Sequence, residues 1–492
     1  LCSANLPDPT ILLPNKHFGT LTYTGDGSAS RTISDTSSVN FTPDWVWAKN
    51  RSQTDWHILS DAVRGFDGKT LYTNRTDAEY DASGSGEHGY ISAAANGGFV
   101  ATDSDGSVGG NLNANSENYV AWNWNAGDTD GKTYTVKVVS DSGNKYRFDD
   151  FGTSAVTLDL AEGGTYTFDQ SDSSMSSHPM QLSTTANGTH GGGSAYSTGV
   201  TYQLDGSTVT ASAFISGFSS ATSRKLIITV AASAPTLYYY CYYHSGMGGA
   251  VNTNSTLGSS NFDGTIQTTV KANATAGFSI ITYSGNGTTG STIGHGLGVK
   301  PDAIIIKCRS NADNWMVYHK GVNAGVDPED YYLNLNNTNA QTNSVIMLND
   351  TAPTSSVVTL QNDSSANSSS RTYVMYCFSE VAGYSKFGRY DGNNANNGTF
   401  VFTGFRPAWV MIKRYETTRD WIIYDNKRST FNVIDDFLEP NNNTAEQTAS
   451  GNSVDFVSNG FKFRNNSGDM NGAGDYIYLA FAESPFKNSR AR

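Results

Sequence analysis

The stretch that decides the fold is Pro407-Ala-Trp-Val-Met-Ile-Lys413, because the chain repeats it. Related phrases stand at Pro43-Asp-Trp-Val-Trp-Ala-Lys49 and Pro301-Asp-Ala-Ile-Ile-Ile-Lys307, and the step from proline to lysine is six residues in all three. In each phrase a short apolar run leads up to the lysine, as in a buried β-strand that emerges at its end. Three copies of one pattern predict a repeated module. Such modules build surfaces or scaffolds more often than a single active site.

Further phrases frame each copy. A copy opens on Tyr-x-Gly, places a tryptophan seven or eight residues after the lysine, and closes on a strand that runs from a tyrosine to an aromatic residue five positions later. The openings are Tyr23-Thr-Gly25, Tyr283-Ser-Gly285 and Tyr390-Asp-Gly392; the tryptophans are Trp56, Trp315 and Trp421; the closings begin at Tyr119, Tyr373 and Tyr476. Because these spacings agree in three places, the repeat is the basis of the predicted fold.

The composition predicts an all-β protein. Charged residues make up only 16% of the chain, which also holds 50 glycines, 27 tyrosines and 23 phenylalanines. Aromatic and β-branched runs alternate with turn signals such as Asn286-Gly and Asn459-Gly. We expect tandem antiparallel β-sandwiches of jelly-roll type. The best short helical candidate is the segment from Val433 to Leu438.

The repeat divides the chain into four predicted domains. Residues 1–127 form the first β-sandwich repeat, and residues 128–251 do not follow the pattern. Residues 252–382 hold a linker strand and the second repeat, and residues 383–492 hold the third. The odd segment contains about seven short strand-like runs, which predicts a small β-sandwich of its own.

Charge and cysteine content exclude several classes of protein. The formal net charge is −13 and the pI is near 5.0, whereas nucleic-acid binding needs clustered basic residues. No apolar run reaches the ~18 residues that a membrane span requires. Four cysteines are too few for a disulfide scaffold of this size. Cys308 and Cys377 both fall in the second repeat, and either one bridge or two buried free thiols fits them.

The repeated lysines and tryptophans have two interpretations. In one, the tryptophan is a core residue of the sandwich and the lysine caps the end of a strand. In the other, the pair offers an aromatic platform and a cation to a sugar or surface ligand. We favour the core interpretation, because packing alone would require the same residues in each copy. The candidate binding residues are Lys49, Trp56, Lys307, Trp315, Lys413 and Trp421.

The segment 128–251 carries a set of metal-ligating side chains. It ends on Cys241-Tyr-Tyr-His244-Ser-Gly-Met247, and His178 stands some sixty residues earlier. A thiolate and two imidazoles in a plane with a weak axial thioether form the ligand set of blue-copper sites. A strand would deliver Cys241, a tight loop would bring back His244, and Gly246 would let Met247 turn beneath the site. Met180 is an alternative sulfur ligand.

On these residues the segment resembles the cupredoxin family. The resemblance implies a Greek-key sandwich in which His178, Cys241 and His244 are equatorial copper ligands and Met247 is the axial one. Many cupredoxins carry, beside the upstream histidine, an asparagine that braces the cysteine loop, but here the neighbours are Ser177 and Pro179. The competing interpretation is a sandwich kept as a spacer, without copper.

The whole chain resembles virion and tail-fibre proteins of marine tailed bacteriophages, which combine such repeats with cupredoxin-like inserts. Typical phrases are Gly294-His-Gly-Leu-Gly-Val-Lys-Pro-Asp302 and Ser60-Asp-Ala-Val-Arg-Gly65. The resemblance implies a virion location outside the cell, with other virion proteins and a host surface glycan or receptor as partners. Exposed sandwich edges lead us to expect a homo-oligomer, with a trimer as the first choice.

Three hypotheses for function follow. The favoured one is a non-enzymatic structural or adhesion protein of a phage virion. The second is a copper protein whose segment 128–251 transfers electrons. The third is a carbohydrate-processing enzyme, although no H-E-x-x-H, G-x-S-x-G or P-loop pattern is present. We expect no catalytic residue, no nucleic acid and no membrane insertion.

Overall fold

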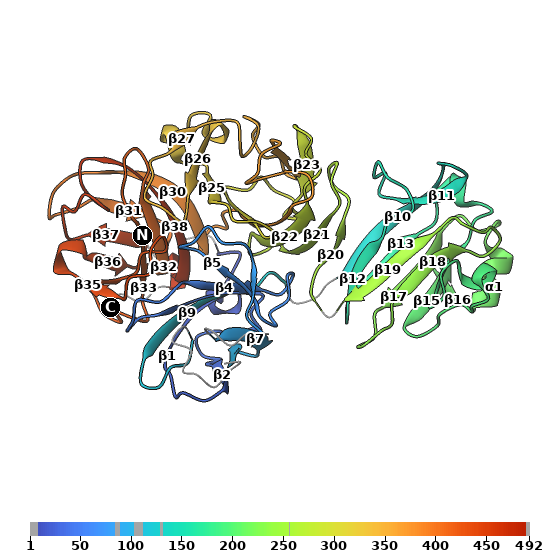
Figure 1. Ribbon diagram of the computed structural model, residues 1–492, viewed down its shortest axis with the longest axis horizontal. Coiled ribbons are helices and arrows are strands. Elements are labelled where there is room, and N and C mark those ends of the chain that lie inside the picture. Colours follow the sequence, from blue (N-terminus) through green and yellow to red (C-terminus); the bar gives the residue numbers. More distant parts are fainter. Residues whose placement is uncertain (1–7, 84–88, 103–111, 128–130, 255, 489–492) are drawn as a thin grey trace. The chain divides into compact units, whose positions relative to one another are not determined.

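The computed structural model describes residues 8–83, 89–102, 112–127, 131–254 and 256–488. Within these ranges it is built from β-strands, and its only α-helix is the short α1 (Ala211–Gly217) (Figure 1). The predicted all-β class is therefore confirmed. No helix among the described residues has the length and apolar character needed to span a lipid bilayer.

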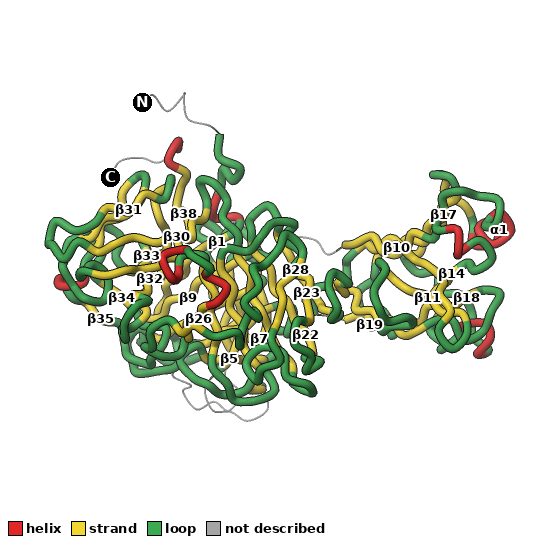
Figure 2. Tube along the Cα trace, turned by 90° about the horizontal axis from the view of Figure 1, so that it is seen from above, coloured by secondary structure: helices red, strands yellow, loops and turns green. Residues whose placement is uncertain are grey.

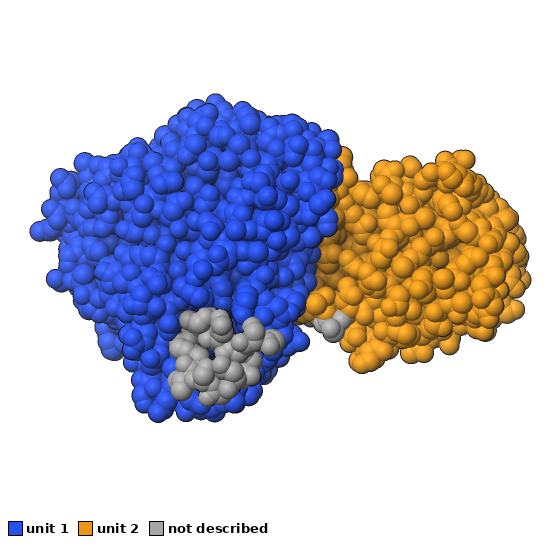
Figure 3. All heavy atoms as spheres, viewed as in Figure 1, with its two compact units in different colours: residues 1–126, 272–291, 295–492 blue, residues 127–271, 292–294 orange. Residues whose placement is uncertain are grey.

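The chain forms two compact units (Figure 3). Unit 1 comprises residues 1–126, 272–291 and 295–492, and unit 2 comprises residues 127–271 and 292–294. All three repeats thus contribute to one unit. The linker strand expected at the start of the segment 252–382, over residues 252–273, belongs to unit 2 as far as residue 271. The predicted boundary at residue 128 falls on residues 128–130, which lie outside the described residues.

Unit 1 contains three large sheets with the same strand order. In each, the opening strand pairs with the closing strand, which pairs with the Pro-to-Lys strand, which pairs with the strand after it. Repeat 1 has β1 (Phe18–Thr24), β9 (Asn118–Trp124), β3 (Trp45–Asn50) and β4 (Ile58–Asp61), extended by β5 (Lys69–Tyr72) and β6 (Tyr80–Asp81). Repeat 2 has β22 (Phe278–Ser284), β29 (Thr372–Phe378), β24 (Ala303–Cys308) and β25 (Trp315–His319), extended by β26 (Tyr331–Asn334) and β27 (Thr342–Asn343). Repeat 3 has β30 (Ser385–Gly392), β38 (Gly474–Pro485), β32 (Phe405–Arg414) and β33 (Trp421–Asp425).

A smaller sheet accompanies the large sheet in repeats 1 and 3. These sheets are β2 (Ser30–Ser34), β8 (Gly98–Thr102) and β7 (Tyr90–Ala95), and β31 (Phe400–Phe402), β37 (Gly460–Phe463) and β36 (Val454–Val457). Shorter elements of unit 1 are η2 (Pro14–Lys16), β28 (Val357–Leu360), β34 (Asp436–Phe437) and β35 (Gln447–Thr448). The segment 433–438, our helical candidate, therefore contains a strand.

The two faces of each large sheet pack against different partners. Trp409 and Met411 of β32 belong to a core that all three repeats share, whereas Val410 and Ile412 belong to the sandwich of repeat 3 alone. Side chains alternate between the faces of a strand, so one apolar run supplies both cores. The shared core, called the central core below, brings aromatic rings of different repeats together. Trp45 of repeat 1 stacks on Tyr376 of repeat 2 with centroids 4.8 Å apart, and Trp124 meets Trp409 of repeat 3 at 5.8 Å.

Unit 2 is a sandwich of two sheets around its own core (Figure 2). The larger sheet has β11 (Asn144–Phe148), β10 (Gly131–Ser140), β13 (Thr165–Asp169), β17 (Arg224–Thr229), β15 (Val200–Leu204) and β16 (Ser207–Val209). The smaller sheet has β12 (Leu158–Ala161), β19 (Gly249–Asn254), β18 (Leu237–Cys241) and β14 (Met180–Ser183). Two of the strand pairs, β10–β13 and β12–β19, are parallel. The turns η3 (Ser173–Met175) and η4 (Gly188–Gly191) flank β14.

Candidate metal centre

The segments that carry the sequence-predicted ligands meet at one end of β14 and β18. Cys241 is the last residue of β18 and pairs with Met180, the first residue of β14. His178 lies two residues before the start of β14, and its backbone N–H donates to Met175 O at 2.8 Å in the turn that follows η3. His244 lies in the loop between β18 and β19. Strand pairing therefore brings together residues that are 63 positions apart in the sequence.

The distances between the donor atoms suit a single metal ion. Cys241 Sγ lies 3.9 Å from His178 Nδ1 and 3.5 Å from His244 Nδ1, and all three donors lie within 4.8 Å of one another. A metal about 2.3 Å from sulfur and about 2.0 Å from nitrogen, in trigonal geometry, would place these donors about 3.5 to 3.8 Å apart. The three side chains therefore stand close to the separations that a metal ion requires.

The electrostatic environment keeps the imidazole of His178 available as a ligand. Burial, and then the neighbouring His244, lower the pKa of His178 below its ordinary value. A neutral imidazole is the form that binds metal ions. Cys241 and His178 are buried, whereas His244 is exposed to solvent. Met247 is buried in the core of unit 2, and so is Met180.

Asn187 and Tyr146 support the ligands, and sequence reasoning missed both. Asn187 Oδ1 accepts from Gly246 N at 2.8 Å, and its Nδ2 donates to Ser245 Oγ at 2.8 Å. Asn187 therefore braces the cysteine loop from a position nine residues beyond His178. The phenol of Tyr146 donates to His178 O at 2.9 Å. Burial, and then Cys241, raise the pKa of Tyr146 well above its usual range, so the phenol keeps its proton.

The repeated lysines lie inside unit 1. Lys49, Lys307 and Lys413 are fully buried, and each ammonium donates to backbone carbonyls. Lys307 bonds Thr76 O of repeat 1 at 3.0 Å, and Lys413 bonds Thr338 O of repeat 2 at 2.9 Å. Burial, acting first, lowers the pKa of each lysine to about 8. Lys307 and Lys413 therefore tie one repeat to another, whereas Lys49 bonds Asn50 O and Gln53 O of its own repeat. None of the three ammonium groups is presented to a surface ligand.

The repeated tryptophans do not all occupy equivalent positions. Trp315 and Trp421 are buried in the central core, and their indole N–H groups donate to Tyr72 O and Asn334 O of the preceding repeat, at 3.0 and 2.9 Å. Trp56 is only half-buried and carries the guanidinium of Arg75 over its ring at 4.1 Å. Trp315 and Trp421 therefore present no exposed ring to a ligand, which argues against the aromatic-platform interpretation at these two positions.

One family model matches most of the sequence. It is described as a domain of unknown function, DUF7483, and it matches residues 13–167 and 251–485. The chain belongs to the DUF7483 family. No match was found among curated proteins or among solved structures.

The DUF7483 match separates the two kinds of residue described above. It includes the lysines and tryptophans of all three repeats, together with most of unit 1. It leaves out residues 168–250, and this gap contains His178, Cys241, His244, Met247 and Asn187. The candidate metal centre is thus carried by a stretch outside the family match, whereas the repeat scaffold lies within it.

Proposed function

We propose that this DUF7483 protein is a non-enzymatic structural and adhesion component of a bacteriophage virion, such as a tail fibre, tail appendage or capsid fibre. Other virion proteins would be its partners within the particle, and a host surface glycan or receptor would be its target outside the cell. Supporting this proposal is the resemblance of the repeats to marine phage proteins. A single structural observation carries it further: the three repeats close on one another around one core, so the repeated motif serves assembly.

Closure is visible in three equivalent backbone hydrogen bonds. Glu79 N of repeat 1 donates to Arg309 O of repeat 2 at 2.7 Å. Gln341 N of repeat 2 donates to Tyr415 O of repeat 3 at 2.7 Å, and Glu446 N of repeat 3 donates to Arg51 O of repeat 1 at 2.9 Å. We call the three contacts the 1–2, 2–3 and 3–1 seams. A body closed in this way within one chain suits a protein that must survive outside a cell.

Electron microscopy tests the virion proposal directly. Phage particles from a lysate that contains this chain would be incubated with gold-labelled antibody raised against it. We expect gold at one defined structure of the particle, and antibody absorbed with the purified protein serves as the control. Particles that remain unlabelled while the chain stays in the soluble fraction would contradict the proposal.

A second candidate function, copper binding by unit 2, has its own observation: the spacing of Cys241 Sγ and the two Nδ1 atoms. Bound copper would supply one-electron redox chemistry. The protein would hold the thiolate in a buried position and leave the edge of His244 open to solvent. A docked redox partner could thus reach the site through one exposed imidazole.

A visible spectrum tests the copper proposal. On addition of Cu(II) to the purified chain we expect an intense band near ~600 nm from a thiolate–copper bond. The band should disappear in Cys241→Ala and persist in Cys308→Ala, because Cys308 is a buried free thiol in unit 1. A colourless protein after Cu(II) addition would sink the copper proposal and leave the virion proposal unaffected.

A further inference from the structure

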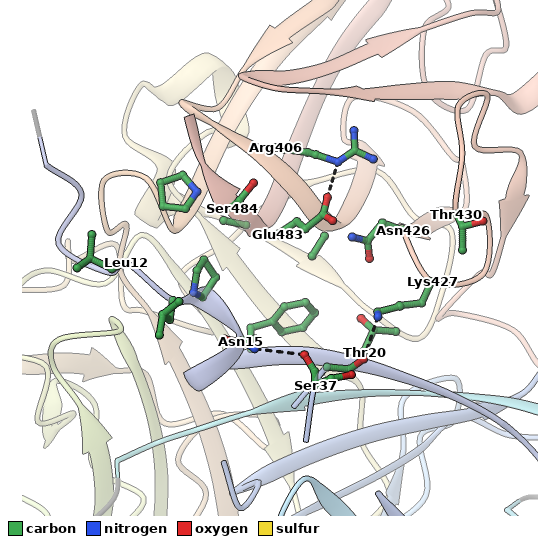
Figure 4. Close-up of a pocket in the computed structure, with 18 residues that line it drawn as sticks. Leu12, Asn15, Thr20, Ser37, Arg406, Asn426, Lys427, Thr430, Glu483 and Ser484 are labelled. Carbon is green, nitrogen blue, oxygen red and sulfur yellow. Dashed lines mark hydrogen bonds and ion pairs between the residues drawn. The ribbon is translucent and has the colours of Figure 1, made fainter. Parts of the chain in front are cut away.

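Unit 1 contains a cavity at the 3–1 seam, between repeat 1 and repeat 3 (Figure 4). Its volume is about 570 Å³, within the range of small-molecule sites. Repeat 1 lines it from η2, the first residues of β1 and the Ser37–Ser38 turn. Repeat 3 lines it from the start of β32, the end of β38 and residues 426–430. Every lining residue is described and belongs to unit 1.

The cavity opens where repeat 3 departs from the repeated motif. Repeats 1 and 2 carry an aspartate after the proline, and repeat 3 carries Ala408. The aspartates tie down the chain that leaves the closing strand: Asp44 Oδ2 accepts from Ala126 N, and Asp302 Oδ2 accepts from Glu380 N, both at 2.7 Å. The methyl side chain of Ala408 cannot accept such a hydrogen bond. In repeat 3 the pairing of β32 with β38 is also irregular around Pro407. Ala408 lines the cavity.

Two polar residues with little exposure line this cavity. Asn426 is 9% exposed and follows β33. Thr20 is 3% exposed, and its hydroxyl is unsatisfied. Buried polar groups normally have hydrogen-bond partners. The equivalent of Asn426 in repeat 2 is Lys320, which is held by Asp302 and Glu380 at 3.1 and 2.7 Å.

The charges at the cavity leave one ammonium group without a direct ion pair among the described residues. The guanidinium of Arg406 is neutralised by Glu483 and also donates to Phe456 O at 2.7 Å. The ammonium of Lys427 donates to the hydroxyl of Ser38 at 2.8 Å, and that hydroxyl donates to Asp35 Oδ2 at 2.6 Å. The ammonium has three N–H donors, so a ligand with a single negative charge could accept from those that Ser38 leaves free. A phosphate-binding site would require more positive charge or a cluster of backbone N–H groups.

We propose that the cavity at the 3–1 seam binds an acidic saccharide, that is, a sugar unit carrying a carboxylate. Lys427 would pair with the carboxylate, and Asn426 would bond hydroxyl groups. The Arg406–Glu483 pair offers donors and acceptors side by side, which suits neighbouring hydroxyls. This inference rests on the proposed adhesive function and names the chemical class of its ligand.

Binding of the full-length chain to an array of matched acidic and neutral oligosaccharides tests the proposal. We expect retention of uronic-acid oligosaccharides and none of their neutral counterparts. Lys427→Ala should weaken binding of the retained glycan at least tenfold by titration calorimetry. Ala408→Asp, which restores the residue of the other repeats, should abolish it. Lys462→Ala, a loss of charge elsewhere on repeat 3, should leave it unchanged.

Thermal unfolding of each variant separates lost binding from lost folding. An array on which no acidic glycan is retained overturns the proposal. Binding that survives both Lys427→Ala and Ala408→Asp also overturns it, because the ligand then lies elsewhere. Either failure is independent of antibody labelling of particles, so the virion proposal could stand without the saccharide site.

Discussion

A one-residue difference in spacing changes which side chain fills the tryptophan position of repeat 1. Lys307 pairs with Trp315 and Lys413 with Trp421 in the strand register. In repeat 1 the tryptophan comes one residue earlier, so the pairing of Ala48 with Ile58 places His57 opposite Lys49. His57 is fully buried, and burial followed by Lys49 lowers its pKa well below the ordinary value.

The role of His57 illustrates what a sequence pattern leaves open. The spacing of seven residues against eight is visible in the sequence, but a strand's start can shift by one residue without any change in composition. The pattern therefore groups Trp56 with the other tryptophans. A backbone contact identifies the true equivalent: the N–H of His57 donates to Asn74 Oδ1, as those of Trp315 and Trp421 donate to Asn336 and Asn441.

Asn187 provides a prediction at the scale of one residue. Asn187→Ala removes both bonds to the cysteine loop while leaving the donor atoms in place. Loss of support next to metal ligands typically lowers metal affinity about 10- to 100-fold. We expect this loss for copper in a competition titration against a chelator. Asn144→Ala, at an exposed strand end of the same unit, is the control. Equal copper affinity of the Asn187→Ala variant and the wild type would contradict the bracing role.

At the scale of the element, the opening and closing strands share one device in all three repeats. The motif tyrosines are direct cross-strand partners, and their rings stack with centroids 4.9 to 5.1 Å apart. The glycine of Tyr-x-Gly follows at a point where another backbone segment approaches closely. A Cβ on Gly285 would lie 2.3 Å from Ser368 O, and one on Gly25 would lie 2.0 Å from Ala114 O. The Tyr-x-Gly motif is therefore explained by two features: the pairing of the opening strand with the closing strand, and the close approach of another backbone segment at the glycine.

Gly285→Ala is the corresponding test. The added methyl group would overlap a backbone carbonyl, so the crossing segment must move. Overpacking of this kind costs about 1 to 3 kcal/mol in the free energy of unfolding. Gly451→Ala, where no atom lies within 4 Å of the position that the methyl carbon would take, should change that free energy by less than about 0.5 kcal/mol. Denaturant titration of both variants measures the difference, and equal midpoints would refute the close crossing.

The buried lysines at the strand ends give a dependence of stability on pH. Each has a pKa of about 8 in the folded chain, against 10.5 ordinarily. Between these values the unfolded chain binds more protons, so the free energy of unfolding should rise as the pH increases from about 8 towards 10. Lys413→Met should reduce this rise, because one of the three groups is removed. Denaturant titrations across that interval measure it, and an unchanged slope in the variant would contradict the shifted pKa.

At the scale of the whole molecule, the sequence predicted the modules but not their closure. The four consecutive apolar residues of Trp409-Val-Met-Ile indicated that both faces of the strand are buried. They could not show that one face meets the other two repeats, because burial does not identify a partner. The helix expected at residues 433–438 was also wrong: β34 lies there, paired with β35. The only described α-helix begins after the N-cap Thr210, in unit 2.

The three donor residues of the candidate metal centre, unlike the closure of the repeats, could be predicted from the sequence. Cys241 ends β18, and His244 follows three residues later in the next loop, so the short spacing alone keeps the two side chains close. His178 required strand pairing, which the resemblance to cupredoxins supplied. The bracing role of Asn187 could not be predicted, because an Asn-Gly pair is an ordinary turn signal. Only the folded loop shows that its amide reaches Gly246.

Acid stability tests the seams that close unit 1. Glu79 bridges Arg64 of its own repeat and Arg309 of the next, both at 2.8 Å. Burial alone would raise the pKa of Glu79, but the two guanidinium groups outweigh it and lower the pKa from 4.5 to about 2. The stabilisation is therefore complete above about pH 4.5 and is lost as the pH falls through about 2.

Glu79→Gln leaves the buried guanidinium of Arg64 and the half-buried guanidinium of Arg309 without this carboxylate. Breaking a buried pair from one side costs about 3 to 5 kcal/mol, and we expect a loss near the lower value at neutral pH, since Glu79 keeps 13% exposure. The difference between wild type and variant should shrink as the pH falls from 4.5 towards 2, because the wild-type carboxylate becomes protonated. Asp77→Asn removes an exposed partner of Arg75 and should cost under about 1 kcal/mol. A difference that stays constant with pH would show that Glu79 does not hold the 1–2 seam by its charge. The seams would then depend on the backbone bonds and the central core alone.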